Sequence, residues 1–297
     1  MTGRPRHETY AALLAACATA GLDATGAEPI RLAENAIWRL PGGLVARIAK
    51  PGQQDHSARE LRLARWLTTT GIAVVRPYPG LHSPVLADDR PVTFWEELPP
   101  HGTGTVLDVA TLLKQLHALP LPKFSIGHLD PFVRIANRID AATTLPAHDR
   151  TWLHGLLTEL RAAWTELPTG RPECVVHGDA WTGNIARPLN GGDAILLDLE
   201  RCSQGSPEWD LVSSAIKLTA TGTITPTEYD EFCTTYGTDV LQWPGYDTMR
   251  RTRELRMTTY AAQHAATHTE WRQEAQHRVN CLRGRAGQRP WNWRGIA

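Results

Sequence analysis

The sequence of 297 residues has no excess of charge of either sign, because 31 Lys and Arg side chains balance 31 Asp and Glu. A basic field able to hold a nucleic-acid backbone is therefore not indicated. Charge-driven disorder is not indicated either, since charged residues make up 21% of the chain and hydrophobic residues 42%. The chain also lacks an apolar stretch approaching the roughly 20 residues that cross a bilayer. The composition predicts a soluble globular protein of one or two domains, without a nucleic-acid or membrane partner.

Cysteine is scarce and poorly placed for metal binding or cross-linking. The five residues are an odd number, lie far apart and form no CxxC pair, which argues against a zinc site and a disulfide framework: Cys17, Cys174, Cys202, Cys233 and Cys281. The apolar run from Ala11 to Ala16 is too short for a signal sequence, so it is interpreted as part of an opening amphipathic helix. Reduced thiols and a cytoplasmic location are expected. Nothing in the sequence indicates an oligomeric state.

Short β-type runs dominate the first hundred residues. Residues 37–40 and 44–48 flank Pro41-Gly42-Gly43, which predicts a hairpin. Apolar positions along one flank predict a helix over 57–67, with Ser57 as its N-cap. The other expected elements are strands at 74–75, 92–95, 174–177 and 194–197, a linker at 99–104, and helices at 106–119, 132–145, 149–167, 210–221, 226–236 and 247–283.

This order of elements predicts an α+β fold in two lobes. Residues 1–98 form a small strand-rich lobe, and residues 99–297 form a larger, mainly helical lobe. Within the second lobe, leucines and Trp164 form one apolar stripe along the helix at 149–167, which is expected to face the core.

The residues best suited to chemistry follow the strands predicted in the second lobe. Asp179 comes just after the strand at 174–177, Asn184 follows five residues later, and Asp198 ends the next strand. Carboxylate and amide oxygens are hard ligands suited to Mg²⁺, which leaves its other positions to phosphate oxygens and water. With Asn184 and Asp198 on the metal, Asp179 is free to accept a hydroxyl proton during phosphoryl transfer.

These motifs resemble those of the aminoglycoside phosphotransferase family, small-molecule kinases that share the protein-kinase-like fold with choline kinases. The HGDxxxxN signature of that family matches His177 through Asn184, its DxE matches Asp198 and Glu200, and its Gly-x-Pro-x-Trp-Asp-Leu matches 205–211. The resemblance implies a bilobal protein-kinase-like fold, with an N-terminal nucleotide-binding lobe and a C-terminal lobe that binds the acceptor.

The resemblance also implies roles for single residues. Asp179 is expected to be the catalytic base, Asn184 and Asp198 the magnesium ligands, and Asp210 a structural anchor beneath the catalytic loop. Glu200 and His177 are accessory residues, with a purely structural role equally open for Glu200 and favoured for His177.

Weaker matches extend the resemblance toward the N-terminus. Val45-Ala46-Arg47 lies where kinases carry the V-A-x-K strand, so Arg47 is expected to grip the α- and β-phosphates with Glu60 as its partner; Lys50 is a rival cation. Within residues 93–98, Glu96 and Leu98 are expected to contact adenine.

Two further segments match the family less completely. Asn35 falls in the phosphate-covering turn, although residues 32–36 contain no glycine. Residues 112–120 resemble a family helix that ends in Leu-His-x-Leu-Pro.

The expected function is transfer of the γ-phosphoryl group of ATP, or of GTP, to a hydroxyl of a small molecule with Mg²⁺. An aminoglycoside or another antibiotic would make it a resistance enzyme, and a sugar or amino alcohol would make it a metabolite kinase. A metal-dependent phosphoesterase is an alternative, but it leaves Asn184, Arg47 and Glu60 unexplained. A nucleotide-binding module without turnover is another. Protein kinase activity is disfavoured because no Asp-Phe-Gly or Ala-Pro-Glu follows Asp198.

Overall fold

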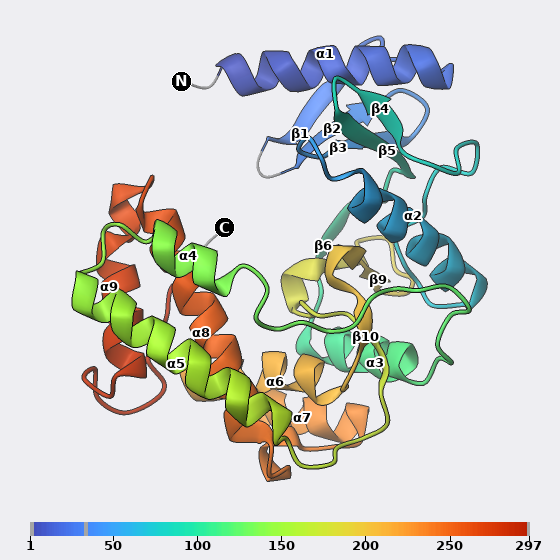
Figure 1. Ribbon diagram of the computed structural model, residues 1–297. Helices are drawn as coiled ribbons and strands as arrows, with labels where there is room; N and C mark the ends of the chain where they lie inside the picture. The colour runs from blue at the N-terminus through green and yellow to red at the C-terminus, as the bar shows by residue number, and fades with distance from the viewer. Residues whose placement is uncertain (1–2, 33–34, 296–297) are drawn as a thin grey trace. The chain divides into compact units, whose positions relative to one another are not determined.

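The computed structural model describes residues 3–32 and 35–295, which fold into two compact units (Figure 1). Unit 1 comprises Met1–Gly104, Pro122–Ile126 and Thr182–Cys202, and unit 2 comprises Thr105–Leu121, Gly127–Trp181 and Ser203–Ala297. The functional division at residues 98 and 99 stays a prediction.

An antiparallel five-stranded sheet forms the centre of unit 1, in the order β1-β2-β3-β5-β4. Its strands are β1 (Glu28–Leu32), β2 (Ala36–Leu40), β3 (Leu44–Ile48), β4 (Val85–Ala87) and β5 (Arg90–Glu96). The predicted hairpin is confirmed as β2 and β3, and both glycines of its turn have positive φ, 77° at Gly42 and 73° at Gly43. The sequence Pro-Gly-Gly therefore meets the backbone demand of a tight turn.

The two faces of this sheet have different neighbours. Helix α1 (Gly3–Ala20) lies across one face (Figure 1), where Leu13 packs into a core cluster with Ala46 and Phe94. Because side chains alternate along a strand, Arg47 of β3 and its cross-strand partner Thr93 point to the opposite face. Helix α2 (Gln54–Thr69) packs against that face, where its Glu60 pairs with Arg47.

Two local predictions for this region were wrong. Helix α2 begins before Ser57, whose N–H donates to the Gln53 carbonyl at 3.0 Å, so Ser57 is not its N-cap. Val74 forms an isolated parallel bridge with Leu196 in place of the expected strand.

The predicted linker contains a strand. Strand β6 (His101–Thr103) pairs with β8 (Ile185–Pro188), which pairs with β9 (Ile195–Leu196) in a second sheet of unit 1. Short 3₁₀ turns, η1 (Thr182–Asn184) and η2 (Leu199–Arg201), flank this hairpin.

Unit 2 is mainly helical. Its helices are α3 (Val106–His117), α4 (Ile135–Ala141), α5 (Ala147–Thr165), α6 (Glu208–Ile216), α7 (Pro226–Tyr236), α8 (Tyr246–Ala265) and α9 (Arg272–Leu282). Strands β7 (Cys174–Val176) and β10 (Ser203–Gly205) pair antiparallel. Helices α4, α5, α8 and α9 lie side by side (Figure 1) around a core that contains the predicted leucine stripe of α5.

Two helices differ from the prediction for local reasons. Helix α4 is shorter because Arg134, just before it, has a φ of 64°, which a right-handed helix does not allow. The long helix expected over 247–283 is two helices. The N–H groups of Thr267 and His268 both donate to the His264 carbonyl, at 3.2 and 3.0 Å, and so close the end of α8. None of the described helices combines the length and apolar character of a membrane span.

Candidate active site

The first group of predicted site residues gathers around Arg47 in unit 1. Its Nη1 lies 2.5 Å from Oε1 and 2.6 Å from Oε2 of Glu60 on α2. Its Nη2 donates to Glu200 Oε2 at 2.9 Å, and it donates to the Asn35 amide oxygen at 2.7 Å when that amide is turned with its oxygen toward the guanidinium. Arg47 is therefore the cation that pairs with Glu60, whereas Lys50 is exposed just beyond β3.

The turn expected to cover the phosphates is described only in part. Ala33 and Glu34 lie outside the described residues, and Asn35 is placed against Arg47 as above.

Charges in this group act on one another strongly because water is largely excluded. The side chains of Arg47 and Glu60 are 18% and 6% exposed. Burial raises the pKa of Glu60; Arg47 opposes this shift, while Asp198 and Glu200 add to it. Burial alone would lower the pKa of Arg47, but Glu60, Asp198 and Glu200 raise it above its usual value. One guanidinium thus faces three carboxylates, an excess of negative charge that favours a cation.

Asn184 and Asp198 lie at the same end of the β8–β9 hairpin. Ile185 pairs with Leu196, and the Leu197 N–H donates to the Asn184 carbonyl at 2.9 Å, so the two predicted metal ligands flank the last paired residues. Asp198 has a φ of 54°, in the left-handed region. Aspartate tolerates this region better than most residues, and such backbone is frequent at functional sites.

The His177-Gly178-Asp179 loop follows β7 in unit 2 and is bound to Asp210 of α6. The Asp210 carboxylate accepts hydrogen bonds from the N–H of His177 at 2.6 Å and of Gly178 at 2.8 Å. Gly178 has a φ of 82°, which explains glycine at this position. The Asp179 N–H donates to His177 Nδ1 at 3.3 Å, and the His177 ring is fully buried. His177 therefore supports the loop from inside.

His117 shares Asp210 with this loop, a contact that the sequence did not reveal. Its Nε2 lies 3.1 Å from Asp210 Oδ2, and its Nδ1 lies 2.9 Å from the hydroxyl of Tyr236. The signal available was its place in the Leu-His-x-Leu-Pro match, which carried no role.

Arg253 of α8 is a second residue that the sequence did not single out. Its guanidinium donates to the Trp209 carbonyl at 2.8 and 3.0 Å and to the Gly178 carbonyl at 3.4 Å, and lies 3.9 Å from Asp210 Oδ1. Burial would raise the pKa of Asp210, but His117, His177 and Arg253 lower it below its usual value. Asp210 is thus held ionised beneath the loop.

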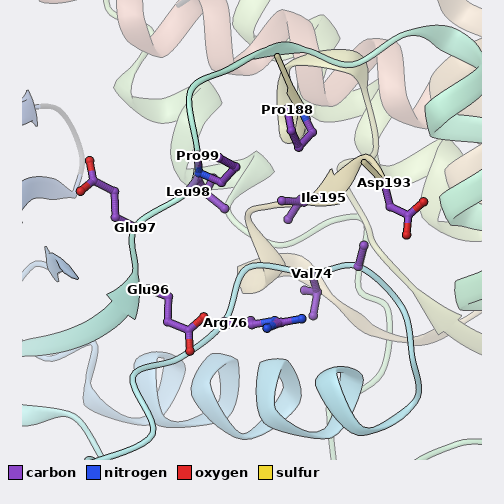
Figure 2. Close-up of a pocket in the computed structure, with 10 residues that line it drawn as sticks. Val74, Arg76, Glu96, Glu97, Leu98, Pro99, Pro188, Asp193 and Ile195 are labelled. Carbon is purple, nitrogen blue, oxygen red and sulfur yellow. The ribbon is translucent and has the colours of Figure 1, made fainter. Parts of the chain in front are cut away.

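Glu96 and Leu98 line a pocket of about 340 Å³ within unit 1 (Figure 2). Val74 and Ile195 form apolar walls, and Arg76 reaches across between Val74 and Glu96. The pocket is also lined by Ala73, Glu97, Pro99, Pro188 and Asp193. Its size is that of a small-molecule site.

The backbone of this segment is partly engaged within unit 1. The Glu96 N–H donates to the Arg76 carbonyl at 2.9 Å, and the Glu97 N–H donates to the Gly43 carbonyl at 2.7 Å. The Glu97 side chain turns away from the pocket (Figure 2) and bonds Arg39 at 2.6 Å. The pocket lining does not include Arg47 or Asn184, so the contact of Glu96 and Leu98 with adenine stays a prediction.

Across residues 3–32 and 35–295, no three His, Cys, Asp or Glu side chains are placed to hold a metal ion together. A magnesium set of one amide and one carboxylate does not require such a cluster.

The family model of the phosphotransferase enzyme family (APH) matches residues 27–255, a stretch that holds every predicted site residue. No curated protein matches the sequence.

Solved structures show the same fold. Choline kinase LicA from Streptococcus pneumoniae is 15% identical, with a TM-score of 0.64 over 92% of this chain and 98% of that one. An aminoglycoside phosphotransferase from Streptomyces rimosus, in complex with ADP and streptomycin, is 19% identical, with a TM-score of 0.56 over 80% and 97%. The amicoumacin kinase hAmiN, in complex with AMP-PNP and Ca²⁺, is 13% identical, with a TM-score of 0.63 over 85% and 88%.

These findings confirm the predicted fold class and the resemblance. A strand-rich N-terminal part and a mainly helical C-terminal part form a protein-kinase-like fold. The chain belongs to the phosphotransferase enzyme family.

Proposed function

We propose that this phosphotransferase moves the γ-phosphoryl group of ATP to a hydroxyl of a small molecule, with Asp179 as the catalytic base. The observation that carries the proposal is the charge group of unit 1, which consists of Arg47, Glu60, Asp198 and Glu200. Arg47 is held by Glu60 at 2.5 Å beside the carboxylate of Asp198, as a nucleotide and a metal would require. The related structures hold ADP or AMP-PNP, which supports a nucleotide substrate.

The residues present fit a divalent cation. Asn184 and Asp198 offer hard oxygen donors at one end of a hairpin, and three carboxylates against one guanidinium leave negative charge for the ion to neutralise. Mg²⁺ bound there would neutralise phosphate charge and orient the phosphates. The Arg47 guanidinium is suited to the α- and β-phosphate oxygens because it presents several donors in one plane.

In the proposed reaction, the acceptor hydroxyl gives its proton to Asp179 while its oxygen forms a bond to the γ-phosphorus. The bond between that phosphorus and the β–γ bridging oxygen breaks, and ADP leaves. Asp210, which bonds the N–H groups of His177 and Gly178, keeps the loop of the base in place. Positioning and charge neutralisation supply most of the catalysis in such reactions.

The test is acceptor-dependent ADP release by the purified chain. Aminoglycosides, sugars, amino alcohols and hydroxy acids are offered with ATP or GTP and Mg²⁺, and the product is identified by mass spectrometry. We expect release only when nucleotide, metal and acceptor are all present. Asp179→Asn should lower kcat by about 10²- to 10⁴-fold with nucleotide binding retained, because only the base is lost.

The matched control is Asp230→Asn, the same change at an exposed aspartate of α7, which should leave kcat unchanged. Phosphate release from esters without nucleotide would establish the phosphoesterase instead. Undiminished transfer by the Asp179→Asn protein would remove Asp179 from the proposal.

A further inference from the structure

Lysine is rare in this chain, and one lysine differs from the rest. Of 31 basic residues only four are lysines, the others being arginines. Lys50, Lys114 and Lys123 are exposed, whereas Lys217 is half-buried. Unlike an arginine, a lysine presents a compact ammonium that is able to lose its proton when it is desolvated.

The backbone at Lys217 departs from the regular helix that carries Asp210. Helix α6 ends at Ile216, and residues Lys217–Thr221 continue as a π-helical turn. Such turns are rare and occur frequently at functional sites, where they re-aim side chains. Here the turn places the ammonium 5.1 Å from the centre of the Trp181 ring.

Trp181 joins Lys217 to the proposed base. It follows Asp179 by two residues in the same unit, and 43% of its surface is exposed, so one part of the ring is open to a ligand. Burial lowers the pKa of Lys217; Asp179 opposes that shift and Arg253 adds to it. Lys217 and Asp179 are therefore close enough to sense each other's charge.

The Lys217 ammonium has donors to spare. Within the described part of the chain, this ammonium makes no hydrogen bond. It is not fully enclosed by protein atoms either, so a ligand can reach it. The predicted phosphate and metal ligands, Arg47, Asn184 and Asp198, all belong to unit 1, whereas Lys217 and Trp181 belong to unit 2 with the base. The Lys217 donors lie in the same unit as Asp179, so they are available to a ligand bound beside that carboxylate.

We propose that Lys217 and Trp181 form the acceptor subsite beside Asp179, and that this subsite selects a hydroxylated ring compound carrying an anionic group, such as a carboxylate. The ring stacks on Trp181, and the anionic group pairs with Lys217. A polycationic acceptor is repelled by Lys217. The inference rests on the proposed function, because it assigns the acceptor of that reaction.

The first test does not depend on turnover. Pyridoxal 5′-phosphate carries an aldehyde and an anionic group, and borohydride reduction traps it on an accessible lysine whose ammonium loses its proton transiently, which peptide mass spectrometry then locates. We expect Lys217 to be labelled at neutral pH. Glucose, glucuronate and glucosamine, which share a pyranose ring but differ in charge, should protect Lys217 in the order glucuronate, glucose, glucosamine.

Labelling at exposed Lys114 with none at Lys217 would overturn the subsite, because no ligand would then reach the ammonium. Equal protection by the three sugars, or strongest protection by glucosamine, would overturn the charge selection. Because labelling needs no phosphoryl transfer, a chain that shows the expected labelling but no transfer to any acceptor contradicts the proposed function alone.

The second test uses variants in the transfer assay. Lys217→Met should raise the KM for the anionic acceptor by about 10- to 100-fold with little change in kcat, since one charged partner is lost. Lys217→Arg should retain most of the affinity, and Lys114→Met, the same change at an exposed lysine of unit 2, should have no effect. An increase in the KM for ATP in place of the acceptor would assign Lys217 to the nucleotide phosphates and overturn the inference.

Discussion

Replacing Asp210 with asparagine should loosen the loop of the proposed base and destabilise unit 2. The carboxylate accepts from His177 N at 2.6 Å, Gly178 N at 2.8 Å and His117 Nε2 at 3.1 Å, and it is fully buried. In Asp210→Asn one of the two oxygens becomes an NH₂ group, which cannot accept from the donor that it then faces.

The expected cost follows from these contacts. An unsatisfied buried N–H costs about 1–3 kcal/mol. Removing one partner of a buried charge pair costs about 3–5 kcal/mol, which here concerns Arg253. Because the two terms describe one carboxylate, we expect a total near the second figure, about 3–5 kcal/mol, lost from the free energy of unfolding. A shift of the loop by about 1 Å should lower kcat about 10²-fold.

The pH dependence of the free energy of unfolding gives a second test of the same variant. The pKa of Asp210 is lowered in the folded chain, so its ionised form contributes stability above the unfolded pKa of about 3.9 and loses it as the pH falls through the folded pKa. The stability difference between wild type and Asp210→Asn should therefore shrink as the pH falls below about 4.

The assay is urea unfolding followed by circular dichroism at several pH values, together with steady-state kinetics. Asp230→Asn in exposed α7 serves as the matched control and should follow the wild type. An Asp210→Asn protein within about 0.5 kcal/mol of wild type, a common size for surface substitutions, would refute the anchoring role. A difference that grows in acid would refute the assignment of the lowered pKa.

Two other substitutions test the charge group of unit 1. Arg47→Met leaves Glu60, Asp198 and Glu200 without their guanidinium, so it should cost about 3–5 kcal/mol of stability, regained in part as acid protonates the carboxylates. Arg47→Met should also raise the KM for ATP about 10-fold or more. Lys50→Met should change neither the stability nor the KM. If urea unfolding and kinetics instead show both effects for Lys50→Met and neither for Arg47→Met, Lys50 is the phosphate ligand. Asp198→Asn suits the φ of 54° but removes the negative charge and replaces one carboxylate oxygen with an NH₂ group, so a Mg²⁺ titration of the rate should show at least about 10-fold weaker metal binding. Unchanged metal dependence would exclude Asp198 as a ligand.

Local signals account for the elements that the sequence located well. Helix α7 has the predicted bounds because Thr225 caps it, Pro226 opens it and Gly237, with a φ of 97°, closes it. The β2–β3 hairpin is set by its own turn. The predicted site residues were also found through local motifs, because each motif places its polar residues directly after a strand within a short stretch of chain.

Elements that depend on distant partners were missed. Strand β6 covers three residues of no β-type pattern, and it becomes a strand because His101 pairs with Pro188. Arg253 and Lys217 lie on helical segments without motifs, and their relation to Gly178 and Asp179 arises only from the packing of unit 2. Sequence periodicity reports which face of a helix is buried, not which remote residue it meets.

The discontinuity of unit 1 has a consequence for how the chain folds during synthesis. The five-stranded sheet is complete in sequence by Glu96, yet unit 1 also needs residues 182–202, and the contact between Arg47 and Glu200 spans 153 positions. Closing such a long loop is slow compared with forming local contacts. Until residues 182–202 have been added to unit 1, β6 has no β8 to pair with, and Arg47 has no Glu200 to bind. A nascent chain therefore completes unit 1 only after α3, α4 and α5 have emerged, and a fragment ending at Gly104 leaves an open strand edge that invites aggregation.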